Sequence, residues 1–192
     1  MLVSCKITNS VLLFLKRQGE DPTPLLEVGS LAENFLRDPS YWMNSKELEF
    51  WLETAVNLFS KDCQQSNLLT AIGHSNPDLR AWGVLDSVLR MLPRPHEILN
   101  QPERFLSYFI SPGPPADNIK RSSNSIEFDL PITSIQYPFL TSYLKAAFES
   151  LPVFVGQPLA SCSWSGLRFK LNWPNEQTSI FSEVDPGRQI SP

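Results

Sequence analysis

Two histidines, His74 and His96, are the only imidazoles in this sequence of 192 residues. Any imidazole-dependent proton transfer or metal ligation would therefore use one of them. His74 directly follows Gly73, and His96 lies between Pro95 and Glu97. Glycine and proline mark helix ends, where an imidazole meets free backbone groups favourably. We predict helix-terminus roles for both, with His96 kept as a weak candidate for a metal ligand.

The other residue types that carry chemistry are scattered along the chain. Cys5, Cys63 and Cys162 form no C-x-x-C pair, and their odd number suits a reducing cytoplasm better than a disulfide framework. The sequence contains no G-x-S-x-G elbow and no glycine-rich phosphate loop. We therefore expect no catalytic residues, no metal site and no nucleotide, and we expect a domain that binds or senses, not an enzyme.

Aromatic side chains form the most suggestive group, because aromatics without matching charge can line an apolar ligand pocket. The candidate pocket residues are Trp42, Trp51, Trp82, Phe105, Tyr108 and Phe109. Aromatics at helical spacing more often fill a core. Both interpretations stay open at this point, and only an unfilled cavity separates them.

Charge and composition narrow the choice of partners. The net charge is −4, and no run of lysines and arginines exceeds two residues, which argues against nucleic acid and against an anionic membrane surface. The apolar run at residues 11–15 is too short to span a bilayer. We expect a cytoplasmic protein that binds a signalling protein, or a small apolar ligand, and that forms a homodimer.

Before residue 110 the apolar residues recur at helical spacing. The firmest helix follows Asn44, where Leu48, Trp51, Leu52 and Ala55 repeat at three and four behind a capping sequence. Further helices are predicted near residues 7–18, 25–28, 31–36, 68–72 (ending at Gly73), 82–92 and 97–108. Pro102 should kink the last of these or mark its restart.

After the proline- and glycine-rich segment 111–115 the period of the pattern changes. Ile126, Phe128 and Leu130 alternate with acidic residues, and Leu167, Phe169, Leu171 and Trp173 alternate with polar ones. With a helix near residues 138–151 between the two hairpins, the order is β-β-α-β-β. The fold class is thus α+β: a helical lobe (1–110), a ββαββ antiparallel-sheet lobe (111–173) sharing its core, and a linker-like tail (174–192).

Three stretches carry a resemblance to a known family: residues 36–55, residues 82–92, and Pro102 to Phe109. They resemble the amino-terminal input region of bacterial, notably cyanobacterial, sensor histidine kinases. The helical lobe followed by β-β-α-β-β also resembles the haem nitric-oxide/oxygen-binding (H-NOX) layout over residues 5–173. The resemblance implies a sensory domain that feeds an output module, its own kinase module being the first candidate.

Haem of the family type is not expected from these residues, and no cofactor is predicted. Where an H-NOX domain places its haem-ligating histidine, this chain has the segment Phe105 to Ser107, and no Tyr-x-Ser-x-Arg motif follows. The main hypothesis is a non-catalytic input domain of a two-component histidine kinase. A haem or tetrapyrrole gas sensor and the effector domain of a transcription regulator are the alternatives.

Overall fold

The computed structural model describes residues 1–60, 68–92 and 102–173. Cys63, His96, residues 97–101 of the helix predicted at 97–108 and the tail lie outside these residues. Within them, no helix is both long enough and apolar enough to cross a membrane.

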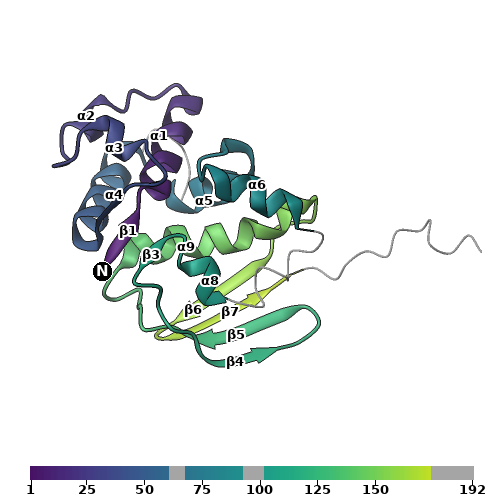
Figure 1. Cartoon of the computed structure of the whole chain (residues 1–192). Coiled ribbons are helices and arrows are strands. Elements are labelled where there is room, and N and C mark those ends of the chain that lie inside the picture. The colour runs from purple at the N-terminus through teal and green to yellow at the C-terminus, as the bar shows by residue number, and fades with distance from the viewer. Residues whose placement is uncertain (61–67, 93–101, 174–192) are drawn as a thin grey trace, which may run out of the picture.

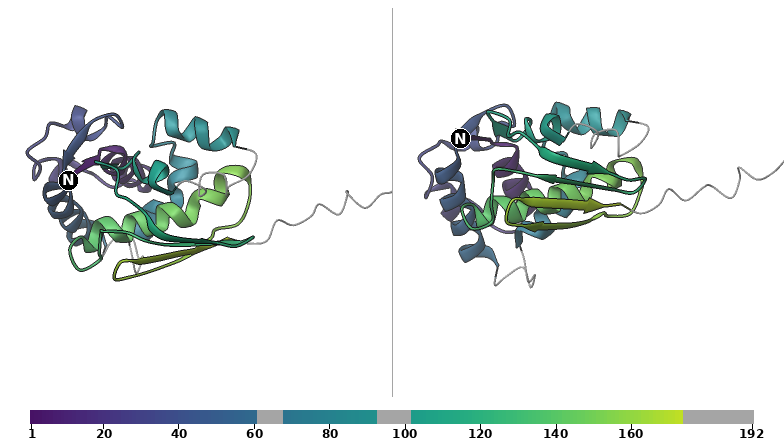
Figure 2. Two further views of the ribbon diagram at one scale, coloured as in Figure 1. Left: turned by 60° about the horizontal axis from the view of Figure 1, so that its bottom comes forward. Right: turned by 90° about the horizontal axis from the view of Figure 1, so that it is seen from below.

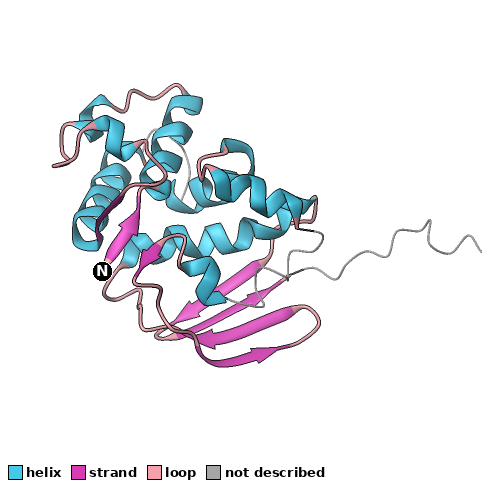
Figure 3. Cartoon of the chain, in the orientation of Figure 1, coloured by secondary structure: helices cyan, strands magenta, loops and turns pink. Residues whose placement is uncertain are grey.

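The helical lobe follows the apolar pattern of the first hundred residues (Figure 3). Its helices are α1 (Lys6–Gln18), α2 (Thr23–Leu26), α3 (Glu33–Leu36), α4 (Ser45–Phe59), α5 (Leu68–Leu79), α6 (Val84–Met91) and α8 (Pro102–Leu106). Gly19 ends α1 in the left-handed region (φ 82°). The Asn44 side chain accepts from the Lys46 N–H and begins α4, as its capping sequence predicts.

The second half forms the predicted β-β-α-β-β unit. Its elements are β4 (Asp117–Arg121), β5 (Ser125–Asp129), α9 (Pro138–Ser150), the 3-10 turn η1 (Leu151–Val155), β6 (Ser161–Ser165) and β7 (Arg168–Asn172). The four strands are antiparallel in the order β4-β5-β7-β6. The α+β prediction is therefore confirmed. Whether 1–110 and 111–173 are separable units stays a prediction.

Helix α9 lies between the helical lobe and the four-stranded sheet (Figures 1 and 2). One face of the sheet contributes Ile126, Phe128, Phe169 and Leu171, all buried, and α9 contributes Leu144 and Phe148 to the same core. Alternation along the strands produces this apolar face, and helical spacing produces the matching stripe on α9. The core thus runs through both halves of the chain.

A second sheet was not predicted. Strands β1 (Leu2–Ser4), β2 (Trp42–Asn44) and β3 (Ile110–Ser111) pair antiparallel in the order β2-β1-β3. Segments of two or three residues are too short to show alternation, so the sequence pattern could not reveal them. This sheet ties the start of the chain to the segment at which the pattern changes period.

Two predicted helix boundaries are wrong. Helix α5 does not end at Gly73 but continues to Leu79 with Pro77 inside it. Pro77 has no N–H for the Gly73 carbonyl, and the Asn76 side-chain amide donates to that oxygen instead, at 2.9 Å. Helix α6 begins at Val84 and not at Trp82, because the Trp82 N–H donates to the Asp86 carboxylate at 2.8 Å and Gly83 takes a positive φ of 65°.

Gly73 is needed because α5 and α9 touch at this point. A Cβ added at Gly73 would lie 2.4 Å from the Ala146 Cβ and 3.0 Å from the Ala147 backbone nitrogen. Real side chains do not approach so closely, so the two helices can pack at this separation only with glycine on α5 and a small residue on α9.

Gly73→Ala should destabilise the protein by roughly 1–3 kcal/mol through overpacking, although alanine has the higher helix propensity. Urea unfolding measures the change. Gly29→Ala is the control, because a Cβ there meets Trp51 at an ordinary 3.6 Å. In a double-mutant cycle with Ala146→Gly, the double variant should lose less than the sum of the single losses. A Gly73→Ala protein as stable as the wild type would contradict the argument.

Candidate functional site

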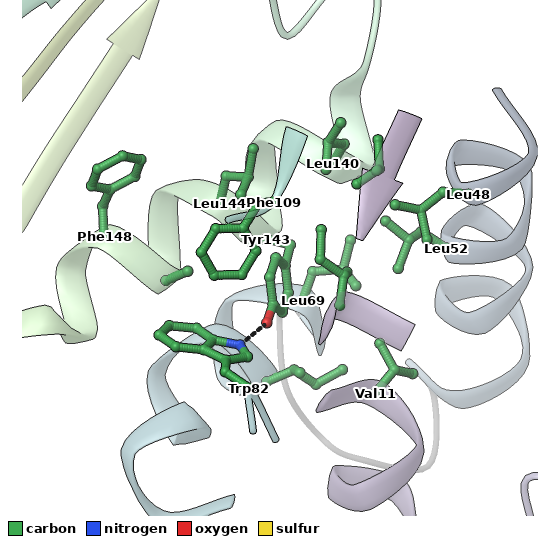
Figure 4. Packing of buried hydrophobic residues seen from close by; sticks show 14 of the residues in the cluster. Val11, Leu48, Leu52, Leu69, Trp82, Phe109, Leu140, Tyr143, Leu144 and Phe148 are labelled. Atoms are coloured by element: carbon green, nitrogen blue, oxygen red, sulfur yellow. Dashed lines mark hydrogen bonds between the residues drawn. The ribbon is translucent and has the colours of Figure 1, made fainter. Parts of the chain in front are cut away.

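The buried hydroxyl of Tyr143 lies where the two lobes meet (Figure 4). It accepts from the Trp82 indole N–H at 3.0 Å and donates to the Ser10 hydroxyl at 2.9 Å. Ser10 in turn donates to the Asn76 side-chain oxygen at 2.8 Å. One hydrogen-bonded chain thus connects α9, α1, α5 and the turn before α6.

Aromatic rings surround this chain. The Trp82 ring centroid lies 5.1 Å from that of Phe109 and 5.5 Å from that of Phe154, on which it stacks. Phe105 lies 5.3 Å from Phe109 and 4.9 Å from Phe148. Three of the six predicted pocket residues, Trp82, Phe105 and Phe109, therefore meet in one cluster, and the cluster is a packed core.

The other three predicted residues lie elsewhere. Trp51 is buried on α4, and its indole N–H has no partner in the structure. Trp42 belongs to β2 and is partly exposed. Tyr108 follows α8 and is also partly exposed. Among the ring contacts of the described residues, neither Trp42 nor Trp51 joins the cluster. Their role in ligand binding stays a prediction.

His74 has a role that the sequence did not reveal. It lies inside α5 and not at a helix end, and its Nε2 is 2.7 Å from the Glu149 carboxylate on α9. The same carboxylate accepts from the backbone N–H of Cys162 on β6 at 2.9 Å. His74 therefore ties the helical lobe to α9 and the sheet.

Burial shifts the pKa of several groups at this interface. Full burial raises the pKa of Tyr143 to about 12, despite its hydrogen bonds with Ser10 and Trp82, so its hydroxyl is neutral at physiological pH. For Glu149, burial acts to raise the pKa, but the hydrogen bonds from His74 and the Cys162 N–H together lower it below its usual value. The Glu149 carboxylate is thus held in its charged form.

A hollow of about 400 Å³ is lined by Trp82 and Tyr108. Its remaining walls come from the start of α1, the turn at residues 39–40 and the first half of α6. Lys6 is the basic residue among those that line the hollow. Two of the six predicted pocket residues, Trp82 and Tyr108, therefore line this hollow. The sequence analysis missed Lys6, because lysines on amphipathic helices carry no distinguishing signal.

No protein-family model matches the sequence, and no curated protein matches it. Solved structures do match. An Fe(II) unliganded mutant H-NOX protein from K. algicida has a TM-score of 0.62 at 11% identity, over 91% of this chain and 98% of that chain. An oxygen-binding H-NOX domain related to soluble guanylate cyclases has a TM-score of 0.58 at 12% identity, over 87% and 92%. A mutant H-NOX from T. tengcongensis has 0.58 at 11%, over 88% and 96%.

The fold is therefore that of H-NOX domains, as the sequence resemblance implied. The prediction of no cofactor, with haem not expected, is wrong by this comparison. The matching structures are described with Fe(II), with bound oxygen and with haem distortion, so haem is the group that this fold implies. The prediction rested on the absence of the family's haem-binding motif from this sequence. At 10–12% identity, sequence motifs are not retained even where the fold is.

The described residues fit a haem only in part. The interface between the lobes is apolar and aromatic, which suits a tetrapyrrole. The one described histidine, His74, is hydrogen-bonded to Glu149, and His96 lies outside the described residues. In this conformation α5 touches α9 at Gly73, so a planar macrocycle between those two helices would have to part them.

Tyr143→Phe should cost roughly 1–3 kcal/mol, because it leaves buried partners such as the Trp82 N–H unpaired. It should also change how the free energy of unfolding depends on pH in the alkaline range. The folded pKa of about 12 exceeds the ordinary value of 10.0, so the unfolded chain releases this proton first and wild-type stability falls as pH rises from 10 to 12. The variant should lose less over this range, by roughly 2 kcal/mol. Urea unfolding at each pH measures both effects.

Tyr41→Phe is the matched control, since the Tyr41 ring packs on Phe35 and takes no part in the chain of hydroxyls. It should leave the free energy of unfolding nearly unchanged and keep the wild-type pH dependence. Identical alkaline limbs for Tyr143→Phe and the wild type would show that the Tyr143 hydroxyl is not held neutral by burial.

Proposed function

We propose that this chain is a non-catalytic sensory domain in which a bound ligand changes the relative pose of the helical lobe and the sheet. The observation that carries the proposal is the H-NOX fold, matched over about nine tenths of the chain. The close packing of α5 on α9 around Gly73 supports it, because a packed interface of this kind changes between discrete arrangements and does not deform gradually.

A haem or another tetrapyrrole is the ligand class that the comparisons favour, ahead of the unspecified ligand of the main sequence hypothesis. Such a group, when bound, supplies a metal that coordinates a diatomic gas. This chain would contribute apolar walls from α5 and α9. His96 is the histidine that we assign to hold the metal of such a group, since His74 is already bonded to Glu149.

For the output we propose a two-component histidine kinase that this domain regulates as a homodimer. Support comes from the sequence resemblance at residues 36–55, 82–92 and 102–109. A kinase module encoded next to this domain is the expected finding. A DNA-binding module in that place would favour the transcription-regulator alternative.

Purified protein incubated with haem should show a Soret absorption band that stays with the protein on gel filtration. His96→Ala should abolish or shift this band, because it removes the side chain proposed to hold the metal. His74→Ala is the control: it breaks the partly buried bond to Glu149, so it should reduce stability and keep the band.

Two results would count against the tetrapyrrole. If the wild-type protein retains no band, a tetrapyrrole is not the ligand. If all three proteins show equal bands, His96 does not hold the metal. A change in the distance between labels on α4 and β4 on adding haem would test the change of pose separately, so the sensory proposal and the choice of ligand can fail independently.

A further inference from the structure

Several apolar side chains that line the hollow beside Trp82 are exposed to solvent. Val84 begins α6 with 81% of its side chain exposed, and Val88 follows it one helical turn later on the same face. Both valines line the hollow, together with Pro39. Its volume of about 400 Å³ falls in the range of small-molecule sites in proteins. A compact apolar group would gain by covering these walls.

Gly83 keeps the hollow in this shape. It has a φ of 65°, which an L side chain rarely adopts, and a Cβ there would lie 3.1 Å from the Pro39 ring. The turn before α6 can therefore lie against the turn at residue 39. The Gly83 turn and the Pro39 turn thus lie close together along the hollow.

Lys6 supplies a positive charge at this site. Its ammonium donates to the Pro39 carbonyl at 2.6 Å and to the Ser4 hydroxyl at 3.3 Å. An ammonium has three donors, so one remains for a ligand. Within the described ranges, no carboxylate forms an ion pair with Lys6. The half-buried Lys6 ammonium is held directly by two neutral oxygens only, and an anion in the hollow would supply the direct ion pair that the described residues do not form with it.

The neighbouring acids limit the charge of that anion. Asp38 is exposed, and water screens its effect on Lys6. Asp86 is buried, which raises the pKa of its carboxyl group. Asp38 and Asp86 both act on Lys6 as negative charges. They would repel a second negative charge on a ligand, so the site suits an anion with one negative charge better than an anion with two.

We propose that this hollow binds a small organic monocarboxylate, with the carboxylate at the Lys6 ammonium and a branched or compact apolar body against Val84 and Val88. The site does not depend on the tetrapyrrole proposal. Its lining residues do not include Tyr143, to which the Trp82 indole N–H donates.

Nuclear magnetic resonance of the whole chain, labelled with nitrogen-15, tests the proposal with isovalerate as the probe. Isovalerate should shift the amide signals of Gly83, Val84, Val88 and Tyr108 in a saturable way. Isovaleramide, which has the same shape and no charge, should bind at least about tenfold more weakly. Inorganic phosphate should also bind more weakly than isovalerate.

Lys6→Met should weaken isovalerate binding about tenfold or more, while Lys16→Met, on the exposed last turn of the same helix, should leave it unchanged. Lys6 also donates to the Pro39 carbonyl, so Lys6→Met could disturb the local structure. A second pair of variants changes an exposed residue that makes no such contact. Val84 is at an exposed position, where Val84→Asp should weaken binding and Val84→Lys should strengthen it. Signal shifts located elsewhere, equal binding of isovaleramide, tighter binding of phosphate, or binding unaffected by Lys6→Met would each overturn the proposal.

Discussion

The contact of α5 with α9 at Gly73 is the constraint on which the rest of the interface depends. Tyr143 lies one turn before Ala146 on α9, and Asn76 lies one turn after Gly73 on α5. Helices that meet without a side chain between them therefore bring the Tyr143 hydroxyl to the level of Asn76 and Ser10. His74, the next residue after Gly73, reaches Glu149 on the flank of the same contact.

Asn76 lets this contact coexist with a proline in the helix. Its amide nitrogen donates to the Gly73 carbonyl, which Pro77 leaves without a donor, and its oxygen accepts from Ser10. A buried polar network stabilises a fold only when its members are paired, and these are. Asp86 shows the contrast: one of its oxygens is buried without a partner, and burial raises the pKa of its carboxyl group.

The features that local rules control were predictable from the sequence, and those that tertiary contacts control were not. Asn44 begins α4 and Gly19 ends α1, as their residue types predict. The alternation at Ile126 and Phe169 predicted the sheet. Gly73 and Pro77 are residue types that indicate helix ends. Packing of Gly73 against α9 and the hydrogen bond from the Asn76 amide to the Gly73 carbonyl nevertheless let the helix continue. Of the site, the sequence identified the Trp82 cluster. It missed Tyr143, Ser10 and Lys6, since a polar residue on an apolar helix face has no partner visible in one sequence.

Ser10 gives this interface two arrangements of nearly the same geometry. Its single hydroxyl hydrogen has two acceptors at 2.8 Å, the Asn76 oxygen and the Lys6 carbonyl. When Ser10 donates to Lys6, the Asn76 oxygen is released to accept from Tyr143, 3.3 Å away. The first turn of α1, which carries the Lys6 ammonium at the hollow, is thereby joined to the buried hydroxyl between the lobes. Because the two acceptors lie at the same distance, the position of that turn relative to α5 determines which of them Ser10 favours.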